Sequence, residues 1–310
     1  MEYLCFESAG AALKSCRRTL GRIGWALGLA FAVFQGVGAA LAFWLERVVP
    51  GAMQDGWISL AVNMLPLYLL GMPLCWLMVR RLPAAAPCEV HGVGAVGLLT
   101  FFTGTYAVGY LLQGATLWWG NLIYQLTGRD FLQAVPTYDQ MSPLPTLLIA
   151  GVLAPILEEA VFRGLLLRRL LPYGRVFATV ATAVLFGLFH GNFFQMFYAF
   201  GIGLVFAYIT IRTGSLVYAT LMHIFFNSFN AACGFLALEY PQLAPLAAIP
   251  LVFAAVGAVL LYRMRHRIAY HLRPAPLPAA ACLGRMVRSV GMWVFFLLCI
   301  GMSVAVLFLP

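Results

Sequence analysis

Long apolar runs separated by short charged segments cover most of this 310-residue sequence. Hydrophobic residues make up 63% of the chain and charged residues only 9%, whereas a soluble domain carries about a quarter charged residues. The 19 Lys and Arg and 10 Asp and Glu are too few to solvate the surface of a water-soluble protein of this size. A soluble enzyme, a secreted disulfide-rich domain and a disordered chain are therefore excluded. We predict an integral, multi-pass membrane protein whose main solvent is the lipid bilayer.

The apolar runs predict an all-α fold, because a helix needs about 20 mostly apolar residues to cross the hydrocarbon core. We expect a polytopic membrane helix bundle of about nine transmembrane helices, with spans near 23–45, 57–79, 93–119, 144–167, 174–191, 194–211, 215–237, 244–262 and 289–309. Only Gly191 and Asn192 separate the fifth span from the sixth, so the two form either a tight hairpin or one long bent helix. We treat the chain as one integral domain with three parts: N-terminal spans in 1–143, a core in 144–237 and C-terminal spans in 238–310.

The basic residues predict how the helices are oriented, because Lys and Arg collect in cytoplasmic loops. With the N-terminus in the cytoplasm, only Arg47 and Arg129 of the 19 basic residues fall in outer loops, and only Arg163 falls within a span. We therefore expect a cytoplasmic N-terminus and an outer C-terminus. This distribution accounts for the net charge of +9 without a nucleic-acid partner. The basic inner loop at 263–288 would attract anionic lipid headgroups.

Few ionisable groups lie deep in the predicted spans, where each is costly and by default a functional hypothesis. They are Glu158 and Glu159, Arg163, His190 and His223. The seven cysteines contain no CxxC pair, so the sequence predicts neither a disulfide framework nor a thiolate metal site. All the deep ionisable groups thus lie between residues 158 and 223, in three of four successive helices.

The acidic pair divides into two different groups. Glu159 and Arg163 are four residues apart and share a helix face, so they can neutralise each other as a helix clamp. Glu158 is rotated by about 100° from Glu159 and has no basic partner on its own helix, so it is available to face other groups. Pro155 lacks a backbone donor and should bend the helix one turn before the pair.

The two histidines each have a partner at the same spacing. His223 and Asn227 project together from the seventh span, and Phe186 lies one turn from His190 on the fifth. At 1.5 Å per residue, Glu158 and His223 lie at similar depths and His190 lies several ångströms deeper, a mismatch that helix tilt can absorb. We therefore expect Glu158, His190 and His223 to meet in one hydrated cavity within the membrane.

Such a cavity has two possible chemistries. A Glu with a His can deprotonate a water and protonate a leaving group, while a second His with an Asn stabilises an oxyanion. Together these groups predict hydrolysis of an amide bond. The alternative is catalytic zinc, for which Glu158, His190 and His223 would be a sufficient set of ligands. No cofactor is firmly predicted.

Three short motifs resemble those of one known family. Glu158-Glu-Ala-Val-Phe-Arg163 resembles the EExxxR signature of the CAAX-protease and bacteriocin-processing (CPBP, Abi) intramembrane endopeptidases. Phe186-Gly-Leu-Phe-His190 is similar to the FxxxH motif of that family, and His223-Ile-Phe-Phe-Asn227 to its HxxxN motif. The resemblance covers residues 144–237, about a third of the chain. The three motifs occur in order on successive helices, which makes the resemblance specific.

The resemblance implies an all-α membrane endopeptidase whose cavity opens toward the cytoplasm. It implies that Glu158 and His190 activate water, that His223 and Asn227 stabilise the oxyanion, and that the second Glu of EExxxR pairs with the Arg. The family has been described both as metalloproteases and as metal-free, glutamate-dependent enzymes. We favour the second description, because Asn227 is better suited to holding a carbonyl than to ligating zinc.

The sequence leaves the substrate open, and two other functions compete. We expect a membrane-associated peptide or protein as substrate and the bacterial plasma (inner) membrane as location. A proton-coupled carrier would use the Glu and His residues as a proton relay, although the repeated interrupted helices of many carriers are not visible here. A non-catalytic scaffold or immunity protein would not need these side chains for chemistry at all.

Overall fold

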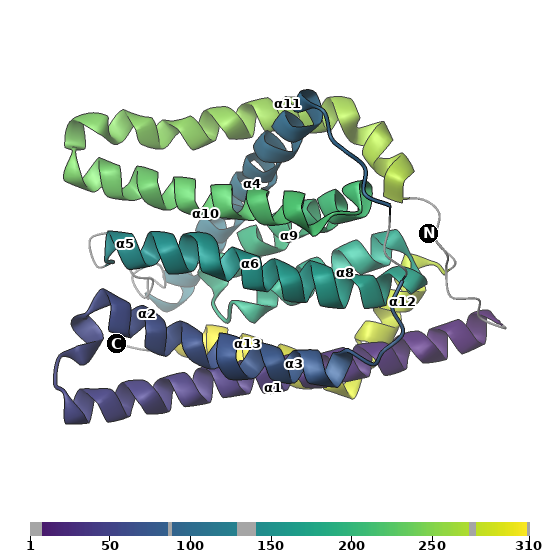
Figure 1. Ribbon diagram of the computed structural model, residues 1–310, viewed down its shortest axis with the longest axis horizontal. Coiled ribbons are helices and arrows are strands. Elements are labelled where there is room, and N and C mark those ends of the chain that lie inside the picture. The colour runs from purple at the N-terminus through teal and green to yellow at the C-terminus, as the bar shows by residue number, and fades with distance from the viewer. Residues whose placement is uncertain (1–7, 86–88, 129–140, 273–276, 309–310) are drawn as a thin grey trace.

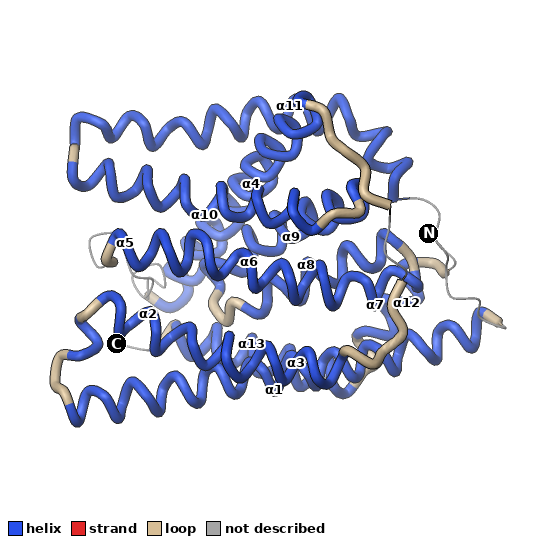
Figure 2. The backbone as a smooth tube through the Cα atoms, in the orientation of Figure 1, coloured by secondary structure: helices blue, strands red, loops and turns tan. Residues whose placement is uncertain are grey.

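The computed structural model describes residues 8–85, 89–128, 141–272 and 277–308 (Figure 1). Within these ranges the regular elements are helices and none is a strand, which confirms the predicted all-α fold (Figure 2). The longer helices are α1 (Ala9–Val48), α2 (Gly56–Leu65), α4 (Ala95–Thr127), α8 (Arg175–Phe189), α9 (Phe193–Thr213), α10 (Leu216–Glu239), α11 (Ile249–Leu272) and α13 (Val290–Val306). Shorter segments are η1 (Ala52–Gln54), η2 (Pro66–Gly71), α3 (Met72–Val79), α5 (Pro143–Pro145), η5 (Thr146–Leu153), α6 (Ala154–Glu159), η6 (Ala160–Leu167), α7 (Arg168–Leu170), η7 (Leu171–Tyr173), η8 (Pro241–Ala248) and α12 (Ala279–Met286).

The described helices provide seven stretches long and apolar enough to cross a membrane. These are Ala9–Val48, Gly56–Val79, Ala95–Thr127, Pro143–Tyr173, Phe193–Thr213, Leu216–Glu239 and Ile249–Ala269. Helices α12 and α13 meet at an angle of 71° and make an eighth if the bent pair counts as one span. The predicted fifth span corresponds to α8, which has only 15 residues and so falls short of the usual length. The chain is therefore a multi-pass membrane protein, while the count of nine spans stays a prediction.

A tight turn, and not a long bent helix, joins α8 to α9. Gly191 has a φ of +63°, a left-handed conformation that glycine adopts without strain. The Asn192 side chain then accepts a hydrogen bond from the Gln195 amide at 2.8 Å and caps α9. The two helices pack along each other as a hairpin. This hairpin places His190 in the turn, at the C-terminal end of α8.

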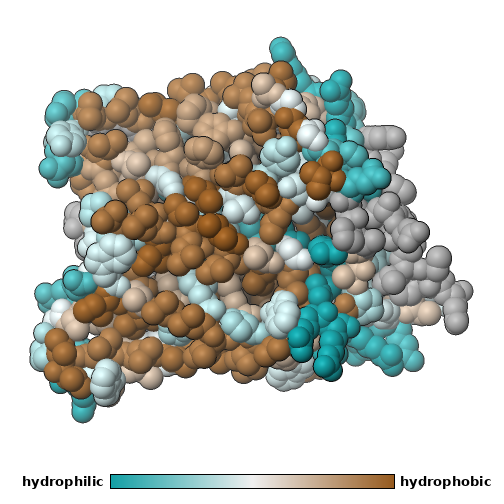
Figure 3. All heavy atoms as spheres, in the orientation of Figure 1, coloured by the Kyte–Doolittle hydropathy of each residue, from teal (hydrophilic) through white to brown (hydrophobic). Residues whose placement is uncertain are grey.

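Basic residues gather at one end of the bundle. Helix α1 begins at that end and α13 finishes at the opposite end (Figure 1). Hydrophobic side chains form the body of the visible face, and hydrophilic ones lie toward its two ends (Figure 3).

The predicted loop at 263–288 is partly helical: α11 continues to Leu272, and α12 occupies Ala279–Met286. Charged residues such as Arg263 end the apolar run without ending the helix, since a helix can project beyond the hydrocarbon core.

Helices α1 and α13 approach so closely that their contact requires glycine. A Cβ atom on Gly24 would collide with the backbone of Gly291, whereas a Cβ on Gly36, on the same helix, would meet nothing within 4 Å. We expect Gly24→Ala to destabilise the protein by about 1–3 kcal/mol, because the two helices must move apart. Gly36→Ala should be neutral or stabilising by up to about 1 kcal/mol, through its better helix propensity. Thermal unfolding of the two variants in detergent checks this, and equal melting temperatures would contradict the close contact.

Candidate active site

The acidic pair lies where the helix of the fourth span departs from α-helical geometry. Residues 143–173 form one continuous helical stretch that includes Pro155, but π-helical segments η5 and η6 flank the short α6 on both sides. In a π-helix each N–H group bonds to the carbonyl five residues earlier, and such segments occur frequently at functional sites. Glu158 and Glu159 end α6, and η6 begins directly after them. The expected irregularity near Pro155 is therefore a change of helical geometry and not a break.

Glu159 and Arg163 form a fully buried ion pair. Arg163 Nη1 lies 2.8 Å from Glu159 Oε1, and both side chains have an exposed fraction of 0%. Arg163 Nη2 also donates to the carbonyl oxygen of Gly203 on α9 at 3.3 Å. The Arg163 guanidinium lies 4.5 Å from the ring centroid of Phe186 on α8, within the range of a cation–π contact. This one side chain thus contacts the acidic helix, α8 and α9 together.

His223 lies between the two glutamates. Its Nδ1 is 3.0 Å from Glu159 Oε1, a distance at which Nδ1–H donates to the carboxylate. Its Nε2 faces the other acid and lies 3.9 Å from Glu158 Oε2. The ring also packs against Phe206 on α9, with centroids 4.9 Å apart. A buried carboxylate therefore fixes the orientation of an imidazole whose other nitrogen faces a second carboxylate.

Glu158 is more accessible than Glu159, Arg163 and His223. Its side chain has an exposed fraction of 19%, compared with 3% for His223 and 0% for Glu159. Arg163 neutralises Glu159, whereas Glu158 makes no ion pair with a Lys or Arg in the part of the chain that the structure describes. Of the two acids, Glu158 is the one that a water molecule or a substrate can approach.

His190 lies beside this group without contacting Glu158 directly. Its Nδ1 donates to the carbonyl oxygen of Phe186 at 2.8 Å, which leaves Nε2 as the nitrogen that can exchange a proton. Both imidazoles pack edge-on against the Phe186 ring, whose centroid is 5.0 Å from His190 and 5.7 Å from His223. Among the described residues no ion pair joins Glu158 to His190; the imidazole that faces Glu158 is His223. The expected activation of water by Glu158 together with His190 stays a prediction, and His223 is the imidazole that lies 3.9 Å from Glu158.

Asn227 lies one turn from His223 on α10, as its spacing predicted. One N–H of its carboxamide donates to the carbonyl oxygen of Ala150 at 3.0 Å. The adjacent Ser228 hydroxyl donates to the carbonyl oxygen of Gly151 at 3.1 Å. Both acceptors belong to the π-helical segment η5, whose carbonyls are displaced from regular α-helical bonding. These two contacts tie α10 to the helix that carries the glutamates.

The side chains do not assemble into a ligand set for zinc. Three protein ligands would have to converge on one ion within about 2.0–2.3 Å. In the described part of the chain no group of three His, Cys, Asp or Glu side chains is placed to do so. In the predicted alternative set of Glu158, His190 and His223, the Nδ1 of His223 is bonded to Glu159 and the Nδ1 of His190 to the Phe186 carbonyl. We therefore derive no chemical step through a metal.

Sequence reasoning missed the contribution of α9. Gly203 supplies a carbonyl acceptor to Arg163, and Phe206 supplies the ring that packs on His223. Neither residue gave a signal, because a glycine and a phenylalanine in an apolar helix are indistinguishable from ordinary packing residues. The ion pair, the shared His223 and the aromatic packing together form the candidate site.

Comparison with known protein families matches the segment that carries this site to one family. Residues 140–229 match the family described as type II CAAX prenyl endopeptidase Rce1-like. The matched segment includes the predicted site residues from Glu158 to Asn227, and it confirms the family resemblance of the three motifs. No curated protein and no solved structure matches the chain.

Proposed function

Because residues 140–229 match the Rce1-like family of type II CAAX prenyl endopeptidases, we propose that this chain is an intramembrane endopeptidase. The reaction is hydrolysis of a peptide bond in a membrane-associated protein or peptide. The observation that carries this proposal is the position of His223, 3.0 Å from Glu159 Oε1 and 3.9 Å from Glu158 Oε2. A buried carboxylate that orients an imidazole next to a second, more accessible carboxylate is suited to moving protons during hydrolysis.

Glu158 is the general base in this proposal. A water molecule between Glu158 and the scissile carbonyl loses a proton to the Glu158 carboxylate and attacks the carbonyl carbon. The accessibility of Glu158, and the absence of a Lys or Arg partner for it among the described residues, support this assignment. General-base assistance of this kind typically contributes about 10²–10⁴-fold to a rate.

His223 completes the proton transfer. Glu159 holds the Nδ1–H group, so Nε2 is the nitrogen available for exchange with Glu158. When the tetrahedral intermediate collapses and the C–N bond breaks, the proton taken from water passes through Glu158 and His223 to the leaving amine. His190, whose Nδ1 is bonded to the Phe186 carbonyl, keeps its Nε2 for a further role as proton acceptor or water ligand.

Asn227 is the proposed oxyanion donor. One of its two N–H groups is bonded to the Ala150 carbonyl, which fixes the orientation of the carboxamide, and the second is available to a developing negative charge. Asn227 lies one turn from His223 on α10, the residue whose Nε2 is 3.9 Å from Glu158, so the proposed oxyanion donor and the proposed base lie on either side of His223 in the chain of contacts.

The competing functions predict other outcomes. A proton-coupled carrier would take up solute into liposomes and lose this uptake in a Glu158→Gln variant. A non-catalytic scaffold or immunity protein would keep its cellular function when Glu158, His190 and His223 are replaced together. We place the enzyme in a bacterial plasma membrane, with the basic end of the bundle in the cytoplasm.

Comparative membrane proteomics tests the proposed function and identifies the substrate. Strains that express the wild type or Glu158→Gln at equal levels are compared for peptides that end at new termini. We expect a small set of termini from membrane-associated proteins to be present with the wild type and absent with Glu158→Gln. The same termini in both strains, at the same abundance, would contradict the peptidase assignment.

A further inference from the structure

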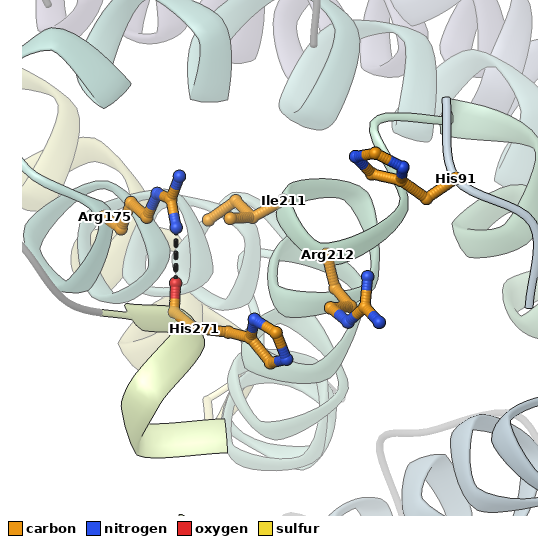
Figure 4. Close-up of a pocket in the computed structure, with 5 residues that line it drawn as sticks. All are labelled: His91, Arg175, Ile211, Arg212 and His271. Atoms are coloured by element: carbon orange, nitrogen blue, oxygen red, sulfur yellow. Dashed lines mark hydrogen bonds between the residues drawn. The ribbon is translucent and has the colours of Figure 1, made fainter. Parts of the chain in front are cut away.

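A cavity lined mainly by basic side chains opens at the basic end of the bundle, away from the candidate site. It has a volume of about 220 Å³ and is lined by His91, Arg175, Ile211, Arg212 and His271 (Figure 4). These residues come from the segment before α4, from the start of α8 and from the ends of α9 and α11. Four of the five side chains are cationic or can become so, and none is acidic. Such a lining is suited to an anion.

The contacts around this cavity hold its walls together. Arg175 Nη1 donates to the backbone carbonyl of His271 at 2.7 Å, which connects α8 to α11 (Figure 4). The His91 amide donates to the Thr213 carbonyl at 2.8 Å, which connects the segment before α4 to the end of α9. Partial burial lowers the pKa of His271, and the charges of Arg212 and Arg175 lower it further. The positive charges of Arg175 and Arg212 thus both act on the space around His271.

A second cavity, almost entirely apolar, lies between helices that also line the first. Its volume is about 330 Å³, and it is lined by residues of α4, α8, α9 and α11 that include Phe101, Val176, Val180, Val205, Leu261 and Leu272. Val176 directly follows Arg175, and Leu272 directly follows His271. The two cavities therefore lie along the same three helices, α8, α9 and α11, and residues that are neighbours in the chain line both of them.

The apolar cavity extends from the basic end toward the middle of the membrane. On α9 its lining runs from Tyr208 back to Leu204, and on α11 from Leu272 back to Leu261. At 1.5 Å per residue, Leu261 lies about 15 Å along α11 from His271. Thr179 lies one turn below Arg175 in this lining, and its buried hydroxyl has no partner among the described residues. Thr100 and Tyr208 also line this cavity, so positive charge is followed by a few hydroxyl groups and then by hydrocarbon.

We propose that these two cavities bind one anionic phospholipid. Its phosphate group lies among Arg175, Arg212 and His271, and one acyl chain fills the apolar cavity between α4, α8, α9 and α11. Guanidinium groups form strong charge-assisted hydrogen bonds with phosphate, and basic pockets between transmembrane helices bind anionic headgroups. The order of charge, polar group and hydrocarbon along the cavities matches that of a phospholipid and does not match that of a free phosphate ion.

Native mass spectrometry of the purified full-length protein tests this site. Phosphatidylglycerol and phosphatidylcholine with identical acyl chains are titrated separately, and bound lipid is counted for each protein. We expect one phosphatidylglycerol molecule to bind about tenfold more tightly than phosphatidylcholine, since hydrogen bonds to charged groups are the strong ones. Equal binding of the two lipids would overturn the proposal without reference to any variant.

Two variants and one control separate the headgroup from the chain. Arg212→Gln should weaken phosphatidylglycerol binding about tenfold, whereas Arg265→Gln, an exposed arginine near the same end of α11, should leave it unchanged. Val180→Phe fills the apolar cavity and should also weaken the binding of this lipid. Melting curves without added lipid show whether each variant is folded.

Inorganic phosphate distinguishes the two sources of the anion. If millimolar phosphate displaces the lipid from the wild type, and Val180→Phe binds the lipid as the wild type does, the site recognises phosphate alone and the proposal is wrong. An equal effect of Arg212→Gln and Arg265→Gln would likewise overturn it, because binding would then follow the overall charge of this end.

Discussion

Purified Glu158→Gln is expected to cleave the substrate about 10²–10⁴-fold more slowly than the wild type, with little change in folding. Gln has nearly the same size as Glu but cannot take a proton from water. Because Glu158 has no Lys or Arg partner among the described residues, its replacement strands no charge in the core. Initial rates of cleavage of the substrate found by proteomics, measured in detergent at equal enzyme concentration, check this expectation.

Glu239→Gln is the matched control. Glu239 is an exposed carboxylate at the end of α10, far along the helix from His223, and its replacement should leave cleavage and melting unchanged. A cleavage rate in Glu158→Gln within a factor of about three of the wild type would remove Glu158 from the role of general base, given the usual size of that effect. A loss of activity together with a large loss of melting temperature would assign Glu158 to the fold and not to the chemistry.

The largest effect on stability should come from Arg163→Ala. This change removes the only Lys or Arg partner of Glu159 among the described residues and the contact with the Gly203 carbonyl, in a place from which water is excluded. Breaking a buried ion pair by removing one partner costs about 3–5 kcal/mol, since it leaves an uncompensated charge. We expect a strongly reduced yield from the membrane and a clearly lower melting temperature.

A double variant distinguishes the lost charge balance from the lost volume of the side chain. In Glu159→Gln/Arg163→Met both charges are gone, a long side chain still fills the space, and the carboxamide oxygen that replaces the carboxylate can still accept the Nδ1–H of His223. This variant should recover much of the yield that Arg163→Ala loses, because replacing a buried ion pair by uncharged groups is often nearly neutral. Arg17→Ala, which removes an exposed arginine of α1, is the control for loss of charge alone. If Arg163→Ala expressed and melted like that control, the ion pair would not be holding the helix.

The fold was predictable where apolar runs and charge were the only determinants. Each predicted span overlaps an observed helix, because the bilayer requires backbone groups to bond within the helix. The ends of the helices were less predictable. The helix α11 continues past Arg263 to Leu272, and α8 stops after 15 residues at the turn formed by Gly191. A run of apolar residues measures contact with lipid, whereas a helix ends where its backbone bonding ends.

The site was predictable within each helix and less so between helices. The spacing of Glu159 and Arg163 predicted their ion pair. The spacing of His223 and Asn227 predicted that both project from one face of their helix. Which imidazole faces Glu158 depends on how α6, α8 and α10 pack, and that packing left no pattern in the residues. The rise per residue already placed His190 deeper than His223, and in the structure both imidazoles pack edge-on against the Phe186 ring.

The central claim is that Glu158 and His223 act as one catalytic unit, and a double-mutant cycle tests it most directly. Relative kcat/KM is measured for Glu158→Gln, His223→Gln and the double variant, with melting curves to show that all three are folded. Residues that act as a unit are strongly non-additive, so the double variant should be no more than a few-fold slower than the slower single variant. Losses that multiply in the double variant, as for independent sites, would contradict the account.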